Sequence, residues 1–473
     1  MIAYYFPPEG GAGSYRPLRF VGQLSKTGWR TAVITADPYS YERYDPGLLG
    51  SVPSETNVVR LRGRDLWQSI QSWRGQQTKT KISNGPVGIA DQIRAAHYKP
   101  IRSRIRRAVR KAEAFYYYPD AAKHWIRPAV SATVQLCVRN RTDVIWASAG
   151  PMTAWIVARQ ASKKTGVPYV LDLRDPHGLS YYEPECKQPE SVKRRIRRTM
   201  YQLFKDAQSV VFLFDTVAES YYRAFPGALD HAKIHVIPNG YDGETQEFVA
   251  PDESRFTILY TGTLASYRYD TLLQALVLLK RSDPTIKQSL RVLFVGECID
   301  HLAKEAAHLD LCDIVETRPP ISHAQINSLE QQSHAFLVLG RLPTIKGYEL
   351  FAGAKIFSYL KARRPIFGVL PRDETRKILE GVGVCTLADV DSPDEIGRTL
   401  RKLLVAWTEK KLACLLPDRA QCEVYSAERQ AKDLIAALEG APASKSFVPG
   451  SVDIPPSLRS ELLDTAVGVG FHL

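Results

Sequence analysis

The sequence predicts an α/β protein made of two open parallel β-sheets, in two Rossmann-like domains that face a central cleft. Short apolar runs alternate with longer helical stretches through most of the chain, which is the pattern of βα units in a parallel sheet. The pattern restarts after a mostly polar stretch at residues 250–254, which indicates a linker. The length of 473 residues also suits two or three domains of common size.

In the first half of the chain, each expected strand is a short apolar run bounded by turn residues. The run at 1–6 begins abruptly, and we expect the true start of its strand a few residues upstream. The elements that follow are a helix at 16–27, strands at 31–36 and 143–147, a helix at 154–165, and strands at 169–173, 209–214 and 234–237.

The second half repeats the pattern with strands at 256–260, 292–295, 335–339 and 365–369 and helices at 270–281 and 354–361. Ligands of such sheets bind at the carboxyl ends of the strands. We therefore expect a domain at 1–248 with an irregular basic insertion at about 64–120, a domain at 249–420, a helix at 421–440 that returns to the first domain, and a flexible tail at 441–473.

Composition indicates a globular protein of a reducing compartment. Hydrophobic residues make up 44% and charged residues 24% of the chain, and no apolar run approaches the ~20 residues of a membrane helix. The start has no secretory pattern. The seven cysteines lie far apart, without Cys-x-x-Cys or zinc spacing, so we expect small core residues rather than disulfides or metal ligands.

Positive charge is concentrated in the first half. Residues 1–250 hold 36 Lys and Arg against 22 Asp and Glu, whereas the remainder is nearly balanced. The densest stretch, 101–114, would form a helix with one apolar face and one basic face, and 193–198 is a second basic cluster. An anionic membrane surface and plain solvation of an outer helix explain them equally well. Nucleic acid is the least favoured partner because no reader motif accompanies the charge.

A glycine-rich turn follows the first predicted strand. The chain from Tyr4 to Arg16 passes through Gly10, Gly11 and Gly13 before a helix begins. Glycines let backbone N–H groups approach an anion, and a helix N-terminus favours negative charge. A tight βα turn without a ligand is equally consistent with this pattern.

Two further motifs end strands of the first half. Asp172, Arg174, Asp175 and His177 follow one another at the carboxyl end of the strand at 169–173, where sites form. An internal Asp–Arg ion pair that orders the loop is the alternative. The turn 238–240, with Asn239 and Gly240, ends the last strand and serves either a ligand or only a hinge.

The second half contains two motifs that suit a phosphate. Thr261, Gly262 and Thr263 offer donors directly after a strand, and Arg268 follows as a cation. Lys355 stands at a predicted helix start, against the helix macrodipole, which is more easily explained if it meets an anion. A solvated cation beside an ordinary turn is the alternative for both.

Five motifs occur in a characteristic order: the glycine-rich loop, 172–176, 237–242, 260–264 and 355–360. Together they resemble the family-four-type glycosyltransferases, and more closely the bacterial group that assembles cell-surface polysaccharides. The resemblance covers roughly residues 1–440. It implies the GT-B fold, a donor held mostly by the second domain, an acceptor held mostly by the first, retention of anomeric configuration, and catalysis without a metal or other cofactor.

The resemblance also implies roles for particular residues. The catalytic candidates are Arg268, Lys355 and Asp175. The donor-binding candidates are Gly262, Thr263, Ser358, Tyr359 and Glu349. The candidates for the cleft and the acceptor side are Gly10, Gly11, Gly13, Arg16, Arg174, His177, Asn239 and Gly240. The expected partners are a nucleoside diphosphate sugar and a saccharide or lipid-linked saccharide, with the protein cytoplasmic or peripheral on the inner membrane face.

The sequence departs from the family at several positions. Ser358 stands where a ribose-binding Glu is typical, and Glu349 lies one place from the position of its partner Glu. Thr263 replaces a common Arg, and His177 replaces a common Trp. A non-catalytic scaffold protein therefore remains the alternative function, with a nucleotide-sugar epimerase as a third.

Overall fold

The computed structural model describes residues 1–63, 115–148, 150–179, 188–251, 254–342, 347, 350, 352–444, 446–454 and 458. Contacts between residues divide the chain into two compact units. Unit 1 consists of Met1–Ile237 with Ala431–Leu473, and unit 2 of Pro238–Gln430. These divisions lie near the boundaries at 248 and 420 that the sequence indicated. The basic stretch 101–114 and Glu349 lie outside the described residues.

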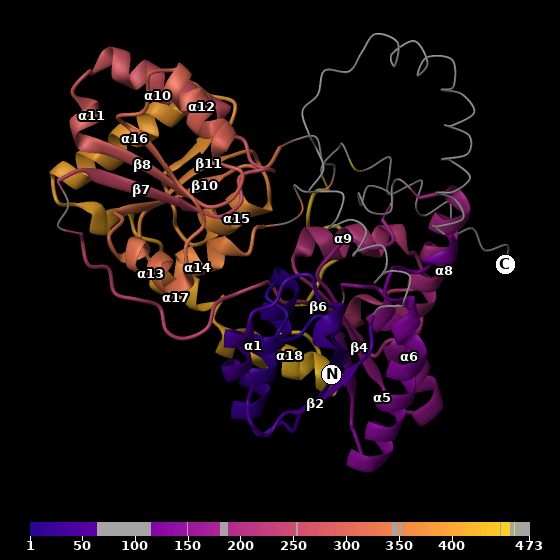
Figure 1. Ribbon diagram of the computed structural model, residues 1–473. Coiled ribbons are helices and arrows are strands. Elements are labelled where there is room, and N and C mark those ends of the chain that lie inside the picture. Colours follow the sequence, from indigo (N-terminus) through magenta and orange to yellow (C-terminus); the bar gives the residue numbers. More distant parts are fainter. Residues whose placement is uncertain are drawn as a thin grey trace, which may run out of the picture. The chain divides into compact units, whose positions relative to one another are not determined.

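Unit 1 is built on parallel strands (Figure 1). They are β1 (Ala32–Ala36), β2 (Asn57–Leu61), β3 (Ile145–Ser148), β4 (Tyr169–Leu173), β5 (Ser209–Phe212) and β6 (Ile234–Val236). Four of them, β3 to β6, pair in sequence order, and β1 pairs with β2.

The first residues of the chain join these two ladders. Ile2 forms parallel bridges with both Ile34 of β1 and Ala147 of β3. Its N–H donates to the carbonyl of Trp146 at 2.7 Å, and its own carbonyl accepts from Ser148 at 3.1 Å. The strand expected at 1–6 is therefore reduced to the residues around Ile2. These residues lie between β1 and β3, where the strand order of the sheet reverses.

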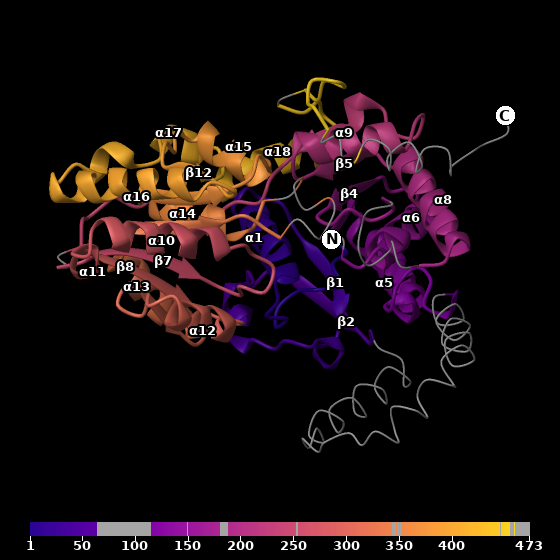
Figure 2. The same ribbon diagram turned by 90° about the horizontal axis from the view of Figure 1, so that it is seen from above.

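Helices cover both faces of the unit 1 sheet (Figures 1 and 2). They are α1 (Ala12–Lys26), α5 (Ile126–Asn140), α6 (Thr153–Thr165), α8 (Glu190–Asp206), α9 (Asp215–Ala224) and most of α18 (Ala427–Glu439). Phe20 and Leu24 of α1 pack with Leu434 of α18 against Trp146 and Val170 of the strands. This shared apolar contact holds the C-terminal helix on unit 1.

Unit 2 contains one six-stranded parallel sheet in the order β12-β11-β10-β7-β8-β9. Its strands are β7 (Phe256–Thr261), β8 (Leu290–Val295), β9 (Val315–Arg318), β10 (Ala335–Leu339), β11 (Ile366–Leu370) and β12 (Leu387–Asp389). The strand order reverses between β7 and β10. In open α/β sheets this reversal opens a crevice at the carboxyl ends of the strands, where ligands bind.

The helices of unit 2 lie on both faces of this sheet, with α10 and α16 on one side and α13 and α14 on the other (Figure 1). They are α10 (Asp270–Ser282), α11 (Ile286–Ser289), α12 (Asp300–His308), α13 (His323–Gln331), α14 (Lys355–Ala362), α15 (Glu374–Gly381), α16 (Pro393–Thr408) and α17 (Arg419–Glu423). Short 3-10 helices are found at Pro38–Ser40, Pro46–Ser51, Lys123–Trp125, His231–Lys233 and Leu412–Leu415.

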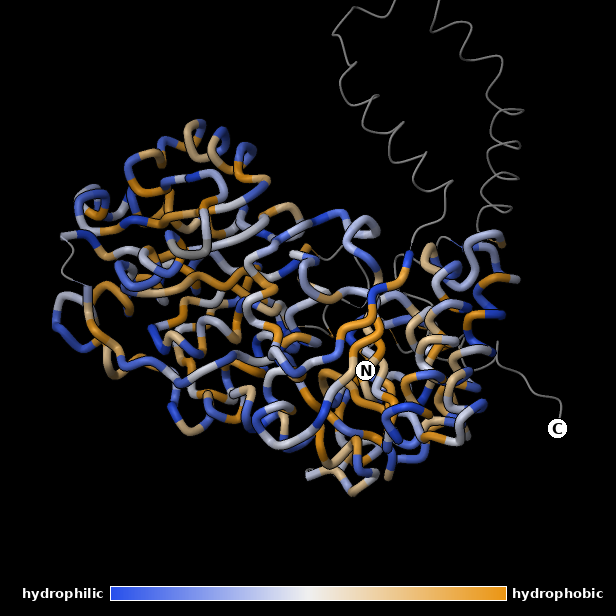
Figure 3. The backbone as a smooth tube through the Cα atoms, turned by 60° about the horizontal axis from the view of Figure 1, so that its bottom comes forward, coloured by the Kyte–Doolittle hydropathy of each residue, from blue (hydrophilic) through white to orange (hydrophobic). Residues whose placement is uncertain are grey.

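The buried strands explain why the sequence pattern was informative. β4, β10 and β11 are buried along their whole lengths. Strands of a parallel sheet covered on both faces are apolar throughout. Figure 3 shows apolar stretches in the interior of each unit and polar stretches along the outer helices and loops.

Three strands were missing from the sequence-based expectation. β2, β9 and β12 are short and only partly buried, and β2, β9 and β12 all lie at edges of their ladders. An edge strand needs no continuous apolar run, so its sequence gives little signal. Partial burial thus accounts for all three omissions.

The expectation of a loose C-terminal tail is wrong for residues 446–454. Phe447 and Ile454 are buried, and Phe447 packs against Tyr222 of α9. The N–H of Gly450 donates to the Glu219 carboxylate at 2.9 Å. Apolar burial and this hydrogen bond hold the segment against unit 1.

The expectation of buried cysteines holds for only two of the described residues. Cys137 and Cys422 are buried, whereas Cys298, Cys312, Cys385 and Cys414 are exposed. Cys298, Cys312 and Cys385 lie in turns or connections, and Cys414 lies in the short 3-10 helix Leu412–Leu415. Within the described part of the chain, no helix combines the length and apolarity needed to cross a membrane.

Candidate functional site

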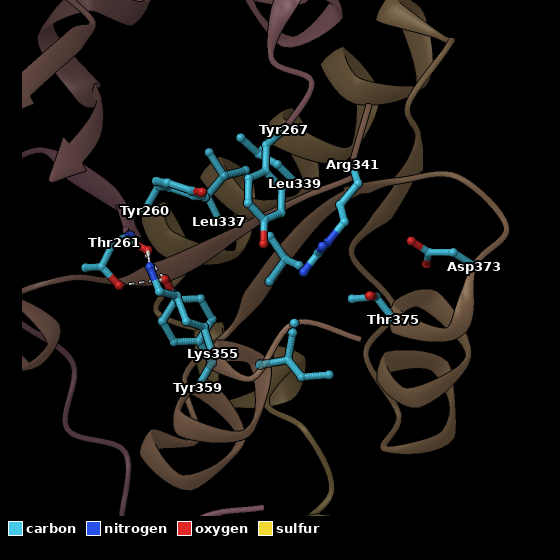
Figure 4. Close-up of a pocket in the computed structure, with 13 residues that line it drawn as sticks. Tyr260, Thr261, Tyr267, Leu337, Leu339, Arg341, Lys355, Tyr359, Asp373 and Thr375 are labelled. Atoms are coloured by element: carbon cyan, nitrogen blue, oxygen red, sulfur yellow. Dashed lines mark hydrogen bonds between the residues drawn. The ribbon is translucent and has the colours of Figure 1, made fainter. Parts of the chain in front are cut away.

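A hollow of about 450 Å³, open to solvent, lies at the carboxyl ends of β7, β10 and β11 in unit 2 (Figure 4). It therefore occupies the crevice that the reversal of strand order opens. The lining residues are Tyr260, Thr261, Tyr267, Leu337, Val338, Leu339, Arg341, Gly353, Lys355, Ile356, Tyr359, Asp373 and Thr375. Tyrosine and aliphatic side chains form most of the wall, and two cations and one carboxylate are set into it.

Lys355 is the first residue of α14, as the sequence indicated. Its ammonium group donates to the carbonyl of Thr261 at the end of β7. Desolvation by the surrounding protein lowers the pKa of Lys355 from 10.5 to about 8, although much of the side chain is exposed. A bound anion would restore the interactions that this ammonium group lacks.

Because Gly262 has no side chain, the end of the Lys355 side chain lies directly against its backbone. Its φ is +125°, and a Cβ atom at this position would overlap the Lys355 Nζ atom. Only glycine combines this backbone conformation with so close an approach. The structure thus brings together two of the predicted site residues, Gly262 and Lys355.

Tyr359 holds the end of β7 in place. Its hydroxyl accepts from the Thr261 N–H at 3.2 Å and lies 3.1 Å from Thr261 Oγ1. The ring stacks on Phe336 at 4.3 Å, and burial raises the pKa of its hydroxyl to about 12. Tyr359 lines the pocket, whereas Ser358 and Thr263 are exposed and do not.

Arg268 does not line the pocket. Its guanidinium is bound by Asp391 at 2.7 Å and lies 3.8 Å from Asp270. Its backbone N–H donates to the Gly340 carbonyl at 2.9 Å. The loop after β7 therefore presents Tyr267, rather than Arg268, to the hollow, and the predicted catalytic role of Arg268 stays a prediction.

Arg341 was missed by the sequence reasoning. It follows β10 after a single glycine, and its guanidinium lies 5.6 Å from the Tyr267 ring centroid. Figure 4 shows Arg341 and Lys355 on opposite sides of the hollow, with the arginine side chain extending inward. A cation directly after a fully buried strand was the signal that could have found it.

Two helix N-termini add to the positive character of this site. α14 begins at Lys355, and α15 begins directly after Asp373, whose carboxylate caps it by accepting from the Arg376 N–H at 2.8 Å. The helix macrodipole favours an anion at such ends. Burial raises the pKa of Asp373 to about 6, so this carboxylate is only moderately acidic. The arrangement suits a ligand with more than one negative charge.

At the corresponding edge of unit 1, Arg16 is a structural residue. It is 3% exposed and donates from Nη2 to Asp172 at 2.9 Å and to the Ile237 carbonyl at 2.9 Å. Ser148 donates to the same carboxylate at 2.7 Å. Asp172 thus forms an internal Asp–Arg ion pair, the alternative considered from the sequence, with Arg16 as a partner. The place of Arg16 on the acceptor side of the cleft stays a prediction.

In the glycine-rich loop of unit 1, a carboxylate of the loop itself, that of Glu9, accepts the hydrogen bonds. One oxygen of Glu9, which is 6% exposed, accepts from the Gly11 N–H at 2.8 Å, and the other accepts from the Ser14 hydroxyl. A Cβ at Gly10 would lie 3.0 Å from the Cβ of Asp45, and one at Gly13 3.1 Å from the Tyr5 ring. The glycines therefore serve close packing, and the start of α1 is neutralised internally.

Arg174, Asp175 and His177 lie in the loop after β4. Arg174 donates to the Gly13 carbonyl, and burial lowers the pKa of its guanidinium while the neighbouring carboxylates raise it. Asp175 is exposed, and the His177 ring packs edge-on against Trp155 at 5.5 Å. This loop is thus tied to the glycine-rich loop, and the assigned roles of these three residues stay predictions.

Asn239 and Gly240 form a tight turn within unit 2. The Asn239 carbonyl accepts from Gln430 at 3.0 Å, and a Cβ at Gly240 would overlap the Tyr425 carbonyl oxygen. Tyr241 pairs with Ser426 in a parallel bridge. These contacts favour the hinge-turn interpretation over a ligand-binding one.

No group of three or more His, Cys, Asp or Glu side chains suited to a metal ion is found among the residues that the structure describes. The absence of a metal or other cofactor in catalysis stays a prediction.

One family model matches about the first half of the chain. Residues 10–240 match the model of the glycosyl transferase 4-like domain. No curated protein sequence matches the chain.

Several solved structures share the fold. Sucrose-phosphate synthase (tll1590) from Thermosynechococcus elongatus is 12% identical, with a TM-score of 0.52 over 90% of this chain and 92% of that chain. The lipopolysaccharide outer core galactosyltransferase WaaB is 11% identical, with a TM-score of 0.52 over 93% and 98%. TarM is 10% identical, with a TM-score of 0.54 over 93% and 98%.

The two parallel sheets and the match at residues 10–240 agree with each other and with the motifs of the sequence. Residues 10–240 thus match a glycosyl transferase 4-like domain, and the chain shares with these solved structures the GT-B fold of two Rossmann-like domains.

Proposed function

We propose that this protein transfers a sugar from a nucleoside diphosphate sugar to an acceptor hydroxyl in the synthesis of a polysaccharide or other cell-envelope glycan. The observation that carries the proposal is the pocket of unit 2, where Lys355, Arg341 and the N-termini of α14 and α15 converge at the strand-order reversal. A diphosphate is the group whose charge matches this set of donors.

The chemistry of the transfer explains why such a site is useful. The bond between the sugar C1 and the diphosphate oxygen breaks, and a bond between C1 and the acceptor oxygen forms. The acceptor hydroxyl loses its proton, and no atom is oxidised or reduced. Negative charge grows on the departing diphosphate, so fixed cations and helix N-termini stabilise the transition state more than the bound substrate.

The finer parts of the proposal rest on the resemblance and on related proteins. The resemblance implies retention of configuration and no metal ion. A TarM structure from S. aureus holds UDP and alpha-GlcNAc-glycerol, and WaaB is a galactosyltransferase of the lipopolysaccharide outer core. By analogy, the acceptor here is a saccharide or a lipid-linked saccharide of the cell envelope.

The surface of α8 supports association with an anionic membrane face. Between Ser191 and Lys205 the helix has no acidic residue, and Arg194, Arg195 and Arg198 are exposed. Val192, Ile196 and Met200 are buried on its other side. An exposed basic helix face is attracted to anionic lipids, and binding there would bring the protein to a lipid-linked acceptor on the cytoplasmic side.

A thermal-shift panel tests the donor proposal most directly, because a ligand that binds only the native state raises its stability. We expect stabilisation by at least one of UDP, GDP, ADP and dTDP, and release of that diphosphate from the matching sugar donor when an acceptor is present. The Lys355→Ala variant should lose the shift. A protein that none of the four nucleotides stabilises would refute the proposal.

A scaffold role without catalysis is the second candidate. Ser358 is exposed where the resemblance places a ribose-binding carboxylate, and it does not line the pocket. Nucleotide binding without any turnover of the sugar donors would favour this candidate. The Ser358→Glu variant would then be expected to strengthen nucleotide binding.

A further inference from the structure

We infer that Arg341, and not Arg268, is the guanidinium that binds the diphosphate of the donor together with Lys355. The inference deepens the proposed function and rests on it. It concerns how this chain supplies its second cation, since Thr263 stands where the resemblance places an arginine and Arg268 is turned away from the pocket.

The backbone places Arg341 firmly at the pocket. Gly340, between β10 and Arg341, is so close to Pro371 that a Cβ would lie 2.5 Å from its Cδ atom. The Gly340 N–H donates to Val369 at 2.8 Å, and its carbonyl accepts from Arg268 at 2.9 Å. Arg341 itself forms an antiparallel bridge with Tyr267. Backbone contacts on both sides therefore fix where its side chain starts.

The side chain is also oriented before any ligand arrives. The guanidinium lies 5.6 Å from the Tyr267 ring centroid, and Tyr267 in turn meets Tyr260 edge-on at 6.1 Å. A cation over an aromatic ring is held by the ring quadrupole. Figure 4 shows the side chain extending toward the centre of the hollow, opposite Lys355. A guanidinium held in this way loses little freedom when it binds a phosphate.

Arg268 has the opposite arrangement. Its guanidinium already has two carboxylate neighbours, Asp391 at 2.7 Å and Asp270 at 3.8 Å. A phosphate would have to break this ion pair, and Arg268 is absent from the pocket lining. The loop after β7 contributes to the donor site indirectly, through Tyr267 and through the hydrogen bond from the Arg268 N–H to Gly340.

Asp373 places a carboxylate in the pocket wall on the side of Arg341. Its carboxylate is 7% exposed and caps α15, and Figure 4 places it and Thr375 on the same side of the hollow as Arg341. Burial raises the pKa of this carboxylate and the charge of Arg341 lowers it, so the two groups interact at this side of the hollow. A guanidinium can bind a pair of phosphate oxygens in the bidentate geometry that Lys355 cannot offer.

Calorimetric titration of the full chain tests the inference. The ligand is whichever of UDP, GDP, ADP and dTDP binds the wild type most tightly, and the matching nucleoside is titrated beside it. Arg341→Ala should weaken diphosphate binding between about tenfold and 100-fold, as expected for charge-assisted hydrogen bonds to phosphate. Nucleoside binding should change by less than about threefold, because it lacks the charged group.

Three variants complete the comparison. Arg268→Ala should weaken diphosphate binding by less than about threefold, and Arg401→Ala, an arginine of α16 that contacts Ser282, controls for loss of a cation elsewhere in unit 2. Arg341→Gln supplies the same test should the alanine variant not fold. Arg341→Lys should recover only part of the affinity, because a lysine lacks the fork of donors.

The outcomes separate the inference from the proposed function. Diphosphate binding that survives in Arg341→Ala but is lost in Lys355→Ala overturns the inference alone. A larger loss in Arg268→Ala than in Arg341→Ala also overturns it and restores the assignment made from the sequence. A wild type that binds none of the four diphosphates overturns both.

Discussion

Replacing Lys355 by methionine should change the stability of the protein little near neutral pH while it removes a cation of the proposed donor site. The ammonium group is desolvated where it contacts the Thr261 carbonyl, which lowers its pKa from 10.5 to about 8. Methionine keeps a chain of similar length without a charge. We therefore expect Lys355→Met to leave the free energy of unfolding near pH 7 within about 1 kcal/mol of the wild type while nucleoside diphosphate binding falls at least about tenfold.

The size of the stabilisation follows from the pKa and the exposure. A shift from 10.5 to about 8 corresponds to roughly 3 kcal/mol for an enclosed group. Lys355 is exposed over more than a third of its surface, so solvent screening reduces this to about 1 kcal/mol. The lost hydrogen bond to Thr261 offsets this gain by roughly 0.5–1.5 kcal/mol, so the two contributions nearly cancel at pH 7.

The dependence on pH provides the sharper test. Because the folded pKa lies below the unfolded value, the unfolded chain binds more protons between pH 8 and 10.5, and wild-type stability rises with pH in that window. The difference in free energy of unfolding between Lys355→Met and the wild type should be constant below pH 8, and above it should change in favour of the wild type. Diphosphate affinity of the wild type should fall as pH rises through about 8, because the ammonium group deprotonates.

Chemical denaturation of both proteins at pH 7, 8, 9 and 10 measures the difference, and calorimetry measures binding at the same pH values. Other titrating groups affect both proteins alike and cancel in the comparison. A stability difference between the two proteins that does not change with pH would refute the assigned desolvation of Lys355. Unchanged diphosphate affinity in Lys355→Met would refute its place in the donor site.

Three further predictions concern unit 1. Asp172→Asn leaves Arg16 buried without its ion pair and should lower the free energy of unfolding by about 3–5 kcal/mol in denaturant titration; a loss below 1 kcal/mol would contradict the buried pair. Arg141, at the C-cap of α5, has a φ of +49°, so Arg141→Gly should stabilise the protein by about 0.5–1 kcal/mol in the same assay, whereas a glycine at the helical Arg139 should destabilise it. The double variant Arg194→Gln and Arg198→Gln should sediment less with anionic vesicles at low salt than the wild type does. An electrostatic membrane contact would be excluded if the wild type bound neutral vesicles equally well, or if added salt did not weaken its binding.

The sequence predicted the elements most accurately where a strand is completely buried. The strands at 169–173 and 335–339 were placed with their observed bounds, because both are buried along their whole lengths. Lys355 was located at the start of its helix because its charge conflicts with the helix macrodipole. Each of these signals is local, and a local signal can be read from a few neighbouring residues.

The features that the sequence analysis did not foresee depend on contacts between distant parts of the chain. Arg16 has the composition of a surface cation, yet Asp172 lies 156 positions away and pairs with it in the core. Glu9 was not considered as the group that occupies the glycine-rich loop. Arg268 follows the expected strand and loop, but Asp391 from the end of another strand binds it.

The sequence by itself determined the alternation of buried strands and amphipathic helices, and with it the two parallel sheets and the carboxyl ends at which a ligand would bind. Only the tertiary structure shows which of two cations lines the pocket at those ends. Arg268 and Arg341 have the same side chain and both follow a buried strand, so periodicity cannot distinguish them. The distinction comes from their neighbours, since Asp391 binds one guanidinium and Tyr267 holds the other beside the hollow.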